Sequence, residues 1–517
     1  LFYGAAAVFY FLGKRLTGSR WAALFGAAML VLSPRMLAES FYNIKDIIFL
    51  SFVIYNLYAG VCFLDKPALK NGILLAAVSA LCINVRVVGA VVPASCLAVG
   101  FVKEITRLSA GLKGVKKTAD PVEAAVLKQT ECSKGAIKRF VKVCLLLAAV
   151  LAASLGFYIL SLPVLWKNPI AELVNTVKTF SDFTNWDDIF WYRGYPVRGN
   201  NLPRSYLFVW IFISTPVLYL GLFALGIAER FAAWVRALWD AVRGNRRTET
   251  FPGLRNHIFF GMVLVIPLCY VVLRRPTLYN GWRHFYFLYA VILIYAMYGA
   301  VFLWRAVTGL DERGKQTGPE GQSGEQSRES VKIRRAEEKQ TWREMLKKYR
   351  WRAVCGFFLS ACMALTFGWM VKNHPYEYVY FNPLVRTYAL GNFELDYWAV
   401  SEADLFRYLC AYDDREEIRL WCTFSDYYKS LAMLPKEDQA RLVYTDSPME
   451  ADYAVCRDLM KTSIEQMERQ FAFEEVYSVV VDGRVLNSLF RRTDAAVMKS
   501  VIIRKDGTLF CSGDGTV

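Results

Sequence analysis

The sequence predicts a polytopic α-helical membrane protein with a small α/β domain at its C-terminal end, outside the membrane. Hydrophobic residues make up 55% of the 517 residues, whereas ordinary globular domains average about 45–50%. Charged residues, at 21%, gather between apolar runs, and these runs stop at about residue 372. The composition excludes a disordered chain, a disulfide-stapled mini-protein and a fibrous protein.

Apolar runs long enough to cross a bilayer recur through the predicted transmembrane domain, residues 1–371. A spanning helix needs about 20 apolar residues, with a range of roughly 17–25, and lipid offers the backbone no hydrogen-bond partner, so the runs are expected to be helical. Five runs are clear, at 140–162, 206–228, 257–274, 284–305 and 351–371. Five shorter or interrupted runs lie at about 1–13, 21–35, 47–64, 70–85 and 87–103. Because Leu1 already lies in an apolar run without an initiator Met or signal peptide, we expect an N-terminally truncated chain.

The distribution of Lys and Arg predicts which side of the membrane each loop faces. Residues 104–139, 229–256 and 306–350 are basic and are expected in the cytoplasm. The third segment is rich in Gly, Ser, Glu, Lys and Arg without an apolar period, which predicts a flexible linker. The outer face of the plasma membrane then receives the following parts: 36–46, the junction near Arg86, 163–205, 275–283 and everything after 372.

The region after the last span differs in character from the rest. Residues 372–409 are expected to lie across the mouth of an external cavity, and 410–517 to form a soluble α/β domain. Strands are predicted at Ile418–Cys422, Leu442–Tyr444 and Tyr453–Val455, and Asp482-Gly483 predicts a two-residue hairpin turn. Four cysteines of this domain either pair in an oxidising compartment or remain buried thiols: Cys410, Cys422, Cys456 and Cys511.

Acidic and basic residues at the outer face are the first candidates for a site. Asp46 stands where a span begins, which suits either an acid in a wet cavity or a helix N-cap. Arg86, Arg275 and Arg283 occupy the side that Lys and Arg usually avoid. Guanidinium groups bind phosphate through paired hydrogen bonds, so the arginines indicate an anionic lipid headgroup, although ordinary headgroup contact remains the alternative.

Aromatic residues mixed with carboxylates mark two outer segments. The loop 163–205 contains Trp186, Asp187, Tyr192 and Arg193, and 374–405 contains Tyr378 and Asp396. Sugar rings suit such surfaces, since they present C–H faces and hydroxyls, but Trp and Tyr also favour membrane interfaces for no catalytic reason. The long loop nevertheless indicates a function.

Cofactor motifs are not found. There is no CxxC pair, the three histidines are dispersed, and no Walker loop, GxSxG or Rossmann glycine run occurs. A His/Cys metal site is therefore not expected, while a carboxylate-bound divalent cation is left open. The energy for a reaction would then come from the substrate and not from ATP.

Five segments in order resemble a known family. They are SPRMLAESFYNIKD, PVLWKNP, YRG…NLPRSYLFVWIFISTP, YNGWRHFYFL and HPYEYVYFNPLV…ELDYW. Together they are similar to bacterial relatives of protein O-mannosyltransferases, within the GT-C superfamily that also contains the aminoarabinose transferase. The resemblance covers residues 1 to about 405 and implies a GT-C-like helical bundle that transfers a sugar, with inversion, from a polyprenyl-phosphate carrier on the outer face.

The resemblance also implies roles for individual residues. The general base belongs to a first external loop that this chain is expected to lack, and Asp46 matches the acid of the second external loop. The donor phosphate would be bound by Arg86, Arg283, His284, Arg275 and Lys45. The substrate and acceptor segments would contribute Trp186, Asp187, Tyr192, Arg193, Tyr279, Tyr378 and Asp396. Arg386 departs from the family, where a small residue follows NPLV.

The residues suit this chemistry independently of the family. A carboxylate can assist deprotonation of an acceptor hydroxyl by a factor of about 10²–10⁴, and fixed arginines stabilise a phosphate leaving group. The expected partners are the lipid-linked donor, the bilayer and a glycan, lipid or protein acceptor, with no nucleic acid. A secondary transporter and a non-catalytic scaffold for the C-terminal domain are the alternatives, but neither an internal repeat nor mid-span acids were identified.

Overall fold

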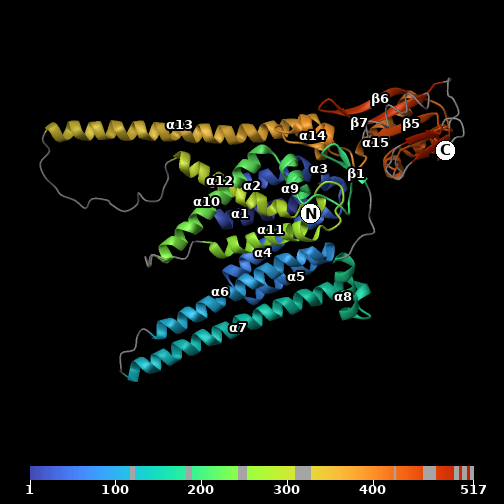
Figure 1. The fold of residues 1–517 in the computed structure, drawn as a ribbon. Coiled ribbons are helices and arrows are strands. Elements are labelled where there is room, and N and C mark those ends of the chain that lie inside the picture. Colours follow the sequence, from blue (N-terminus) through green and yellow to red (C-terminus); the bar gives the residue numbers. More distant parts are fainter. Residues whose placement is uncertain are drawn as a thin grey trace. The chain divides into compact units, whose positions relative to one another are not determined.

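The computed structural model of the protein forms two compact units, which are described separately (Figure 1). The structure describes residues 1–116, 123–181, 189–242, 253–308, 328–423, 427–457, 473–493, 500–503 and 509–512. Unit 1 consists of Leu1–Phe180, Pro216–Tyr270 and Phe285–Gly368. Unit 2 consists of Ser181–Thr215, Val271–His284 and Trp369–Val517.

Helices make up the regular structure of unit 1. They are α1 (Phe2–Thr17), α2 (Arg20–Val31), α3 (Pro34–Tyr42), α4 (Asp46–Asp65), α5 (Leu69–Val85), α6 (Val91–Lys116), α7 (Glu123–Ser161), α8 (Pro169–Ser181), α10 (Val217–Val242), α11 (Leu254–Arg274), α12 (Leu288–Thr308) and α13 (Arg328–Lys372), the last residues of α8, α11 and α13 belonging to unit 2. Within the described residues, seven segments are long and apolar enough to cross a membrane: Asp46–Asp65, Val87–Ser109, Lys134–Ser161, Val217–Arg236, Leu254–Arg274, Leu288–Val307 and Arg350–Lys372. The prediction of a multi-pass helical membrane protein is confirmed.

Prolines divide two of the predicted spans. The run 21–35 becomes α2 and α3, which are bent by 58° with Pro34 at the start of α3. The run 206–228 becomes α9 (Tyr206–Ser214) and α10, because Thr215 precedes Pro216 and takes an extended conformation. In both cases proline offers no backbone N–H to continue the preceding helix.

The predicted linker and the predicted long loop both contain regular structure. The linker prediction 306–350 is wrong from Arg328 onward, where α13 begins, since that part is rich in Glu, Lys and Arg and free of Gly and Pro. The outer loop 163–205 contains α8 and a hairpin of β1 (Ile189–Tyr192) and β2 (Tyr195–Arg198).

Unit 2 contains a five-stranded sheet with the order β4-β3-β5-β7-β6. Its strands are β3 (Ile418–Cys422), β4 (Leu442–Tyr444), β5 (Tyr453–Arg457), β6 (Phe473–Val481) and β7 (Arg484–Arg492). β3 pairs in parallel with β4 and β5, whereas β7 pairs antiparallel with β5 and β6. The helices α14 (Arg386–Asn392), α15 (Val400–Tyr412), α16 (Tyr427–Leu431) and α17 (Lys436–Arg441) accompany it, and β8 (Ser500–Ile503) pairs with β9 (Leu509–Ser512).

Several local predictions for this domain are correct. The three predicted strands are β3, β4 and β5, and the turn between β6 and β7 has positive φ at both Asp482 (50°) and Gly483 (77°), as a type I′ turn requires. Cys410 and Cys422 are buried free thiols and Cys456 is also buried, while the side chain of Cys511 lies outside the described part.

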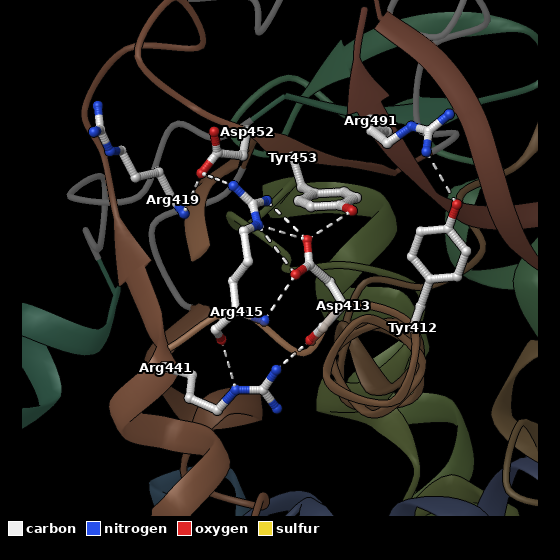
Figure 2. Close-up of polar contacts among 8 residues, drawn as sticks. All are labelled: Tyr412, Asp413, Arg415, Arg419, Arg441, Asp452, Tyr453 and Arg491. Carbon is white, nitrogen blue, oxygen red and sulfur yellow. Dashed lines mark hydrogen bonds and ion pairs between the residues drawn. The ribbon is translucent and has the colours of Figure 1, made fainter. Parts of the chain in front are cut away.

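Asp413 fixes the end of α15 to the sheet (Figure 2). Its carboxylate accepts hydrogen bonds from Arg415, at 2.8 Å to Nη2, and from the Tyr453 hydroxyl at 3.0 Å. Arg441 donates to the carbonyl oxygens of Cys410, Asp413 and Arg415 and so satisfies the last turn of the helix.

Candidate functional site

A buried acidic cluster in unit 1 surrounds the start of α4. Asp46 is 3% exposed and Glu39 is fully buried, and the side-chain amide of Asn43 donates to both carboxylates. Tyr286 donates its hydroxyl proton to Glu39 at 2.7 Å. The backbone N–H of Asp46 in turn donates to Asn43 Oδ1 at 2.9 Å. One asparagine therefore holds two carboxylates side by side.

Arg86 joins this cluster from the end of α5. Its Nη2 donates to Asp46 Oδ1, so two residues that the sequence named for separate roles bind each other in unit 1. The N-cap alternative for Asp46 is wrong, because Lys45 is the N-cap residue and the Asp46 carboxylate binds Arg86 and Asn43. Partial burial of Lys45 lowers its pKa, and repulsion from Arg86 lowers it further. Attraction to Asp46 opposes that shift. Two cations thus lie near one carboxylate.

A second cationic position lies in unit 2. Arg283 stacks between the rings of Tyr279 and Trp398, with its guanidinium carbon 5.0 Å and 4.9 Å from the two ring centroids. Its Nε is buried without a hydrogen-bond partner, and within the described residues its guanidinium forms no salt bridge. His284 meets Tyr279 edge-on, with the ring centroids 4.4 Å apart. Tyr279 thus contacts both Arg283 and His284 in this unit.

The loop carrying Arg283 is anchored on both sides within unit 2. Trp282 is 2% exposed and donates from Nε1 to Ser214 Oγ at 2.8 Å. Asn280 donates to Glu394, which precedes Trp398 in the sequence. These contacts fix the position of Arg283 before any ligand binds, and preorganised charge is what stabilises a developing anion most effectively.

The other predicted site residues lie in different settings. Tyr192 is 3% exposed and packs against Tyr206 and Phe393 in the interior of unit 2, and its role in a substrate or acceptor segment stays a prediction. Arg193 is exposed at the β1–β2 turn with a positive φ of 55°, and Arg275 is exposed at the end of α11. Trp186 and Asp187 lie outside the described residues.

Tyr378 and Asp396 bind each other in the interior of unit 2. The Tyr378 hydroxyl donates to Asp396, and the backbone N–H groups of Val400 and Ser401 donate to the same carboxylate at 3.0 and 3.1 Å. Asp396 therefore caps the start of α15. Burial raises the pKa of Asp396, and Arg457 and these hydrogen bonds oppose that shift. The pair fixes the segment 372–409, and neither residue is open to an acceptor in this structure.

Some polar residues were missed by the sequence argument. Glu39, Asn43 and Asp46 occur at positions i, i+4 and i+7, which is the spacing of neighbours on a helix and could have revealed the cluster. Trp398 and Glu394 gave no comparable signal, because their partners are distant in sequence. Among the described residues no group of three or more His, Cys, Asp or Glu side chains could hold a metal ion.

The helices and polar clusters together define a multi-pass α-helical membrane protein with an α/β domain. Its residues 4–110 match the family described as dolichyl-phosphate-mannose-protein mannosyltransferase, which confirms the sequence resemblance over that part of the chain. The matched stretch contains Asp46 and Arg86. The structure is also similar to the apo crystal structure of ArnT from Cupriavidus metallidurans, with 13% sequence identity, a TM-score of 0.38 and coverage of 94% of this chain and 81% of that chain. No curated protein matches the chain significantly.

Proposed function

We propose that the protein is a membrane glycosyltransferase that moves a sugar from a polyprenyl-phosphate carrier to an acceptor hydroxyl on the outer face of the membrane, with inversion. The match of residues 4–110 to a mannosyltransferase family supports the class of reaction. A hexose similar to mannose is the proposed sugar, and the acceptor is a glycan, a lipid or a protein.

Arg283 is the observation that carries this proposal. A half-buried guanidinium that is held by two aromatic rings, and forms no salt bridge with any described residue, is prepared to bind an anion. The phosphate of the lipid-linked donor is such an anion. As the bond between the anomeric carbon and the phosphate oxygen breaks, negative charge grows on the phosphate, and Arg283 would stabilise it.

The cluster around Asp46 in unit 1 offers a second set of groups that suit the substrates. Arg86 and Lys45 supply positive charge for a phosphate, while Asp46 and Glu39 supply acceptors for sugar or acceptor hydroxyls. The acceptor oxygen attacks the anomeric carbon, its proton passes to a general base that we do not assign, and polyprenyl phosphate leaves. Arg275 and Arg193 are exposed and would contribute long-range attraction at most.

Transfer from a synthetic prenyl-phosphate sugar by protein in lipid nanodiscs tests the proposal. Arg283→Ala and Asp46→Asn should each reduce the release of prenyl phosphate by at least about 10²-fold, the usual effect of removing one stabilising group. Arg283→Lys should retain part of the donor binding, because the charge remains but the stacked planar group is lost. Arg274→Ala is the matched control, since Arg274 is exposed at the end of α11.

Two outcomes would contradict the proposal. Full sugar transfer by both Arg283→Ala and Asp46→Asn would show that neither residue belongs to the active site. Transport of an unmodified solute without any covalent product would indicate a transporter. Membrane insertion and the elution volume in size-exclusion chromatography should be unchanged in every variant, so that lost activity reflects the site.

A further inference from the structure

The tip of the β6–β7 hairpin is bound to the last turn of α13, the final candidate membrane span. Trp369 Nε1 donates to Asp482 Oδ2 at 2.7 Å, and Arg386 Nε lies 3.4 Å from the same oxygen. Since α13 ends at Lys372 and a helix rises about 1.5 Å per residue, Trp369 lies roughly 4.5 Å from the end of the helix. The hairpin tip is thus attached to the end of this candidate span.

Arg386 is the centre of this contact, which we call the hairpin clamp (Trp369, Tyr380, Arg386 and Asp482). Its guanidinium carbon lies 5.5 Å from the ring centroid of Trp369 and 5.9 Å from that of Tyr380. The two rings meet edge to face at 4.8 Å.

An exposed apolar pair flanks the hairpin clamp. Leu384, just before α14, is 68% exposed, and Tyr388, in the first turn of α14, is 52% exposed. Val371, in the same last turn of α13 as Trp369, is 62% exposed and belongs to the candidate span. The apolar pair therefore flanks an arginine that is bound to the end of the candidate span.

We propose that the segment from Leu384 to Tyr388 contacts the lipid bilayer at the boundary of headgroups and acyl chains, and that the hairpin clamp holds the α/β domain against the membrane surface. The bilayer is the occupant because the arginine between the two residues is bound to the end of a span. Tyrosine also favours this boundary, since its ring is apolar and its hydroxyl is polar. Lys372, exposed at the same helix end, suits the headgroup layer.

Site-specific fluorescence in nanodiscs tests the lipid contact. An environment-sensitive fluorescent amino acid is placed at Tyr388 and, as the matched control, at Tyr428, which is 54% exposed on α16. Tyr427, beside it, stacks on Tyr444 of β4, the sheet edge opposite β6, and four strand spacings of about 4.8 Å separate these edges by about 19 Å. The probe at 388 should be quenched by brominated lipids and protected from aqueous iodide. The probe at 428 should be quenched by iodide and not by brominated lipids.

A second variant separates the clamp from the lipid contact. Arg386→Gln should reduce quenching by brominated lipids at position 388 while leaving a probe at Val371 strongly quenched. Equal iodide quenching at 388 and 428 would overturn the lipid contact, and unchanged lipid quenching in Arg386→Gln would overturn the role of the clamp. If Arg386→Gln reduced lipid quenching equally at positions 371 and 388, the span itself would have moved. That outcome also contradicts the role of the clamp.

Discussion

Asp413 shows how one residue can determine the behaviour of a helix end. The hydrogen bond and charge of Arg415 lower the pKa of Asp413 to about 2, and burial opposes that shift. Because the pKa in the folded state lies below the value of about 3.9 in unfolded chains, the pair stabilises the fold above that value. The stabilisation is lost as the pH falls through about 2.

Asp413→Asn should therefore destabilise the protein at neutral pH and much less in acid. Arg415 is half exposed, so the expected loss is at most about 1 kcal/mol. Thermal unfolding in a non-ionic detergent, followed by Trp fluorescence from pH 7 toward pH 2, measures the difference from wild type. Asp414→Asn, at the exposed neighbouring position, should change little throughout. If the loss of thermal stability in Asp413→Asn relative to wild type stayed constant down to pH 2, this account would be contradicted.

Asp46 illustrates what sequence can reveal about a single residue. Its place at the start of a span was evident, and Arg86 was named separately, at another span end on the predicted outer face. Its third neighbour, Asn43, and the second carboxylate, Glu39, were not named, since a polar residue on a short helix gives no sign of burial. Arg283 was named, but its aromatic neighbour Trp398 comes from a segment more than a hundred residues later.

At the scale of elements, two glycines determine the contact between α10 and α12. A Cβ atom added to Gly226 would lie 1.9 Å from the carbonyl oxygen of Tyr295, and one added to Gly299 would lie 1.9 Å from that of Leu222. Both neighbours are backbone atoms, which cannot move aside without shifting a helix. Small residues allow such close approach of helices in membranes.

Gly299→Ala should consequently separate the two helices, whereas Gly221→Ala on α10 should be tolerated. No atom lies within 4 Å of a Cβ at Gly221, and alanine favours a helix over glycine by up to about 1 kcal/mol. Overpacking at Gly299 should cost at least about 1–3 kcal/mol. The apparent melting temperature in detergent and the size-exclusion profile compare the two variants, and identical behaviour would exclude the close contact.

The elements themselves were largely predictable, while their boundaries and contacts were not. Apolar runs located the membrane helices because lipid requires length and apolarity in each segment separately, and Asp482-Gly483 located the β6–β7 turn through local backbone preference. The helical start of α13 was missed because a charged segment without an apolar face resembles a linker by composition. The packing of Gly226 on Gly299 depends on two helices at once, so the sequence of α10 or of α12 by itself does not indicate it.

At the scale of the whole molecule, the connectivity restricts the side on which each segment emerges. Unit 2 gathers 181–215, 271–284 and 369–517, and two candidate spans separate each consecutive pair of these stretches. An even number of crossings returns the chain to the same side, as a compact unit requires. In unit 1 the bond between Arg86 and Asp46 likewise requires that α5, with only 17 residues, cross back after α4.

Counting crossings from Asp46 through α4, α5 and the spans Val87–Ser109 and Lys134–Ser161 predicts that Asp46 and Arg283 emerge on one side, which the distribution of Lys and Arg assigns to the outside. A cysteine introduced at Ile44, which is 81% exposed, and one at Arg275 should both react with a membrane-impermeant maleimide added to intact cells. A cysteine at Lys70, exposed at the start of α5, should react only after permeabilisation, and the unsubstituted protein measures the background of native thiols. Labelling of positions 44 and 275 from opposite sides would contradict this topology, because an even number of crossings separates the two positions.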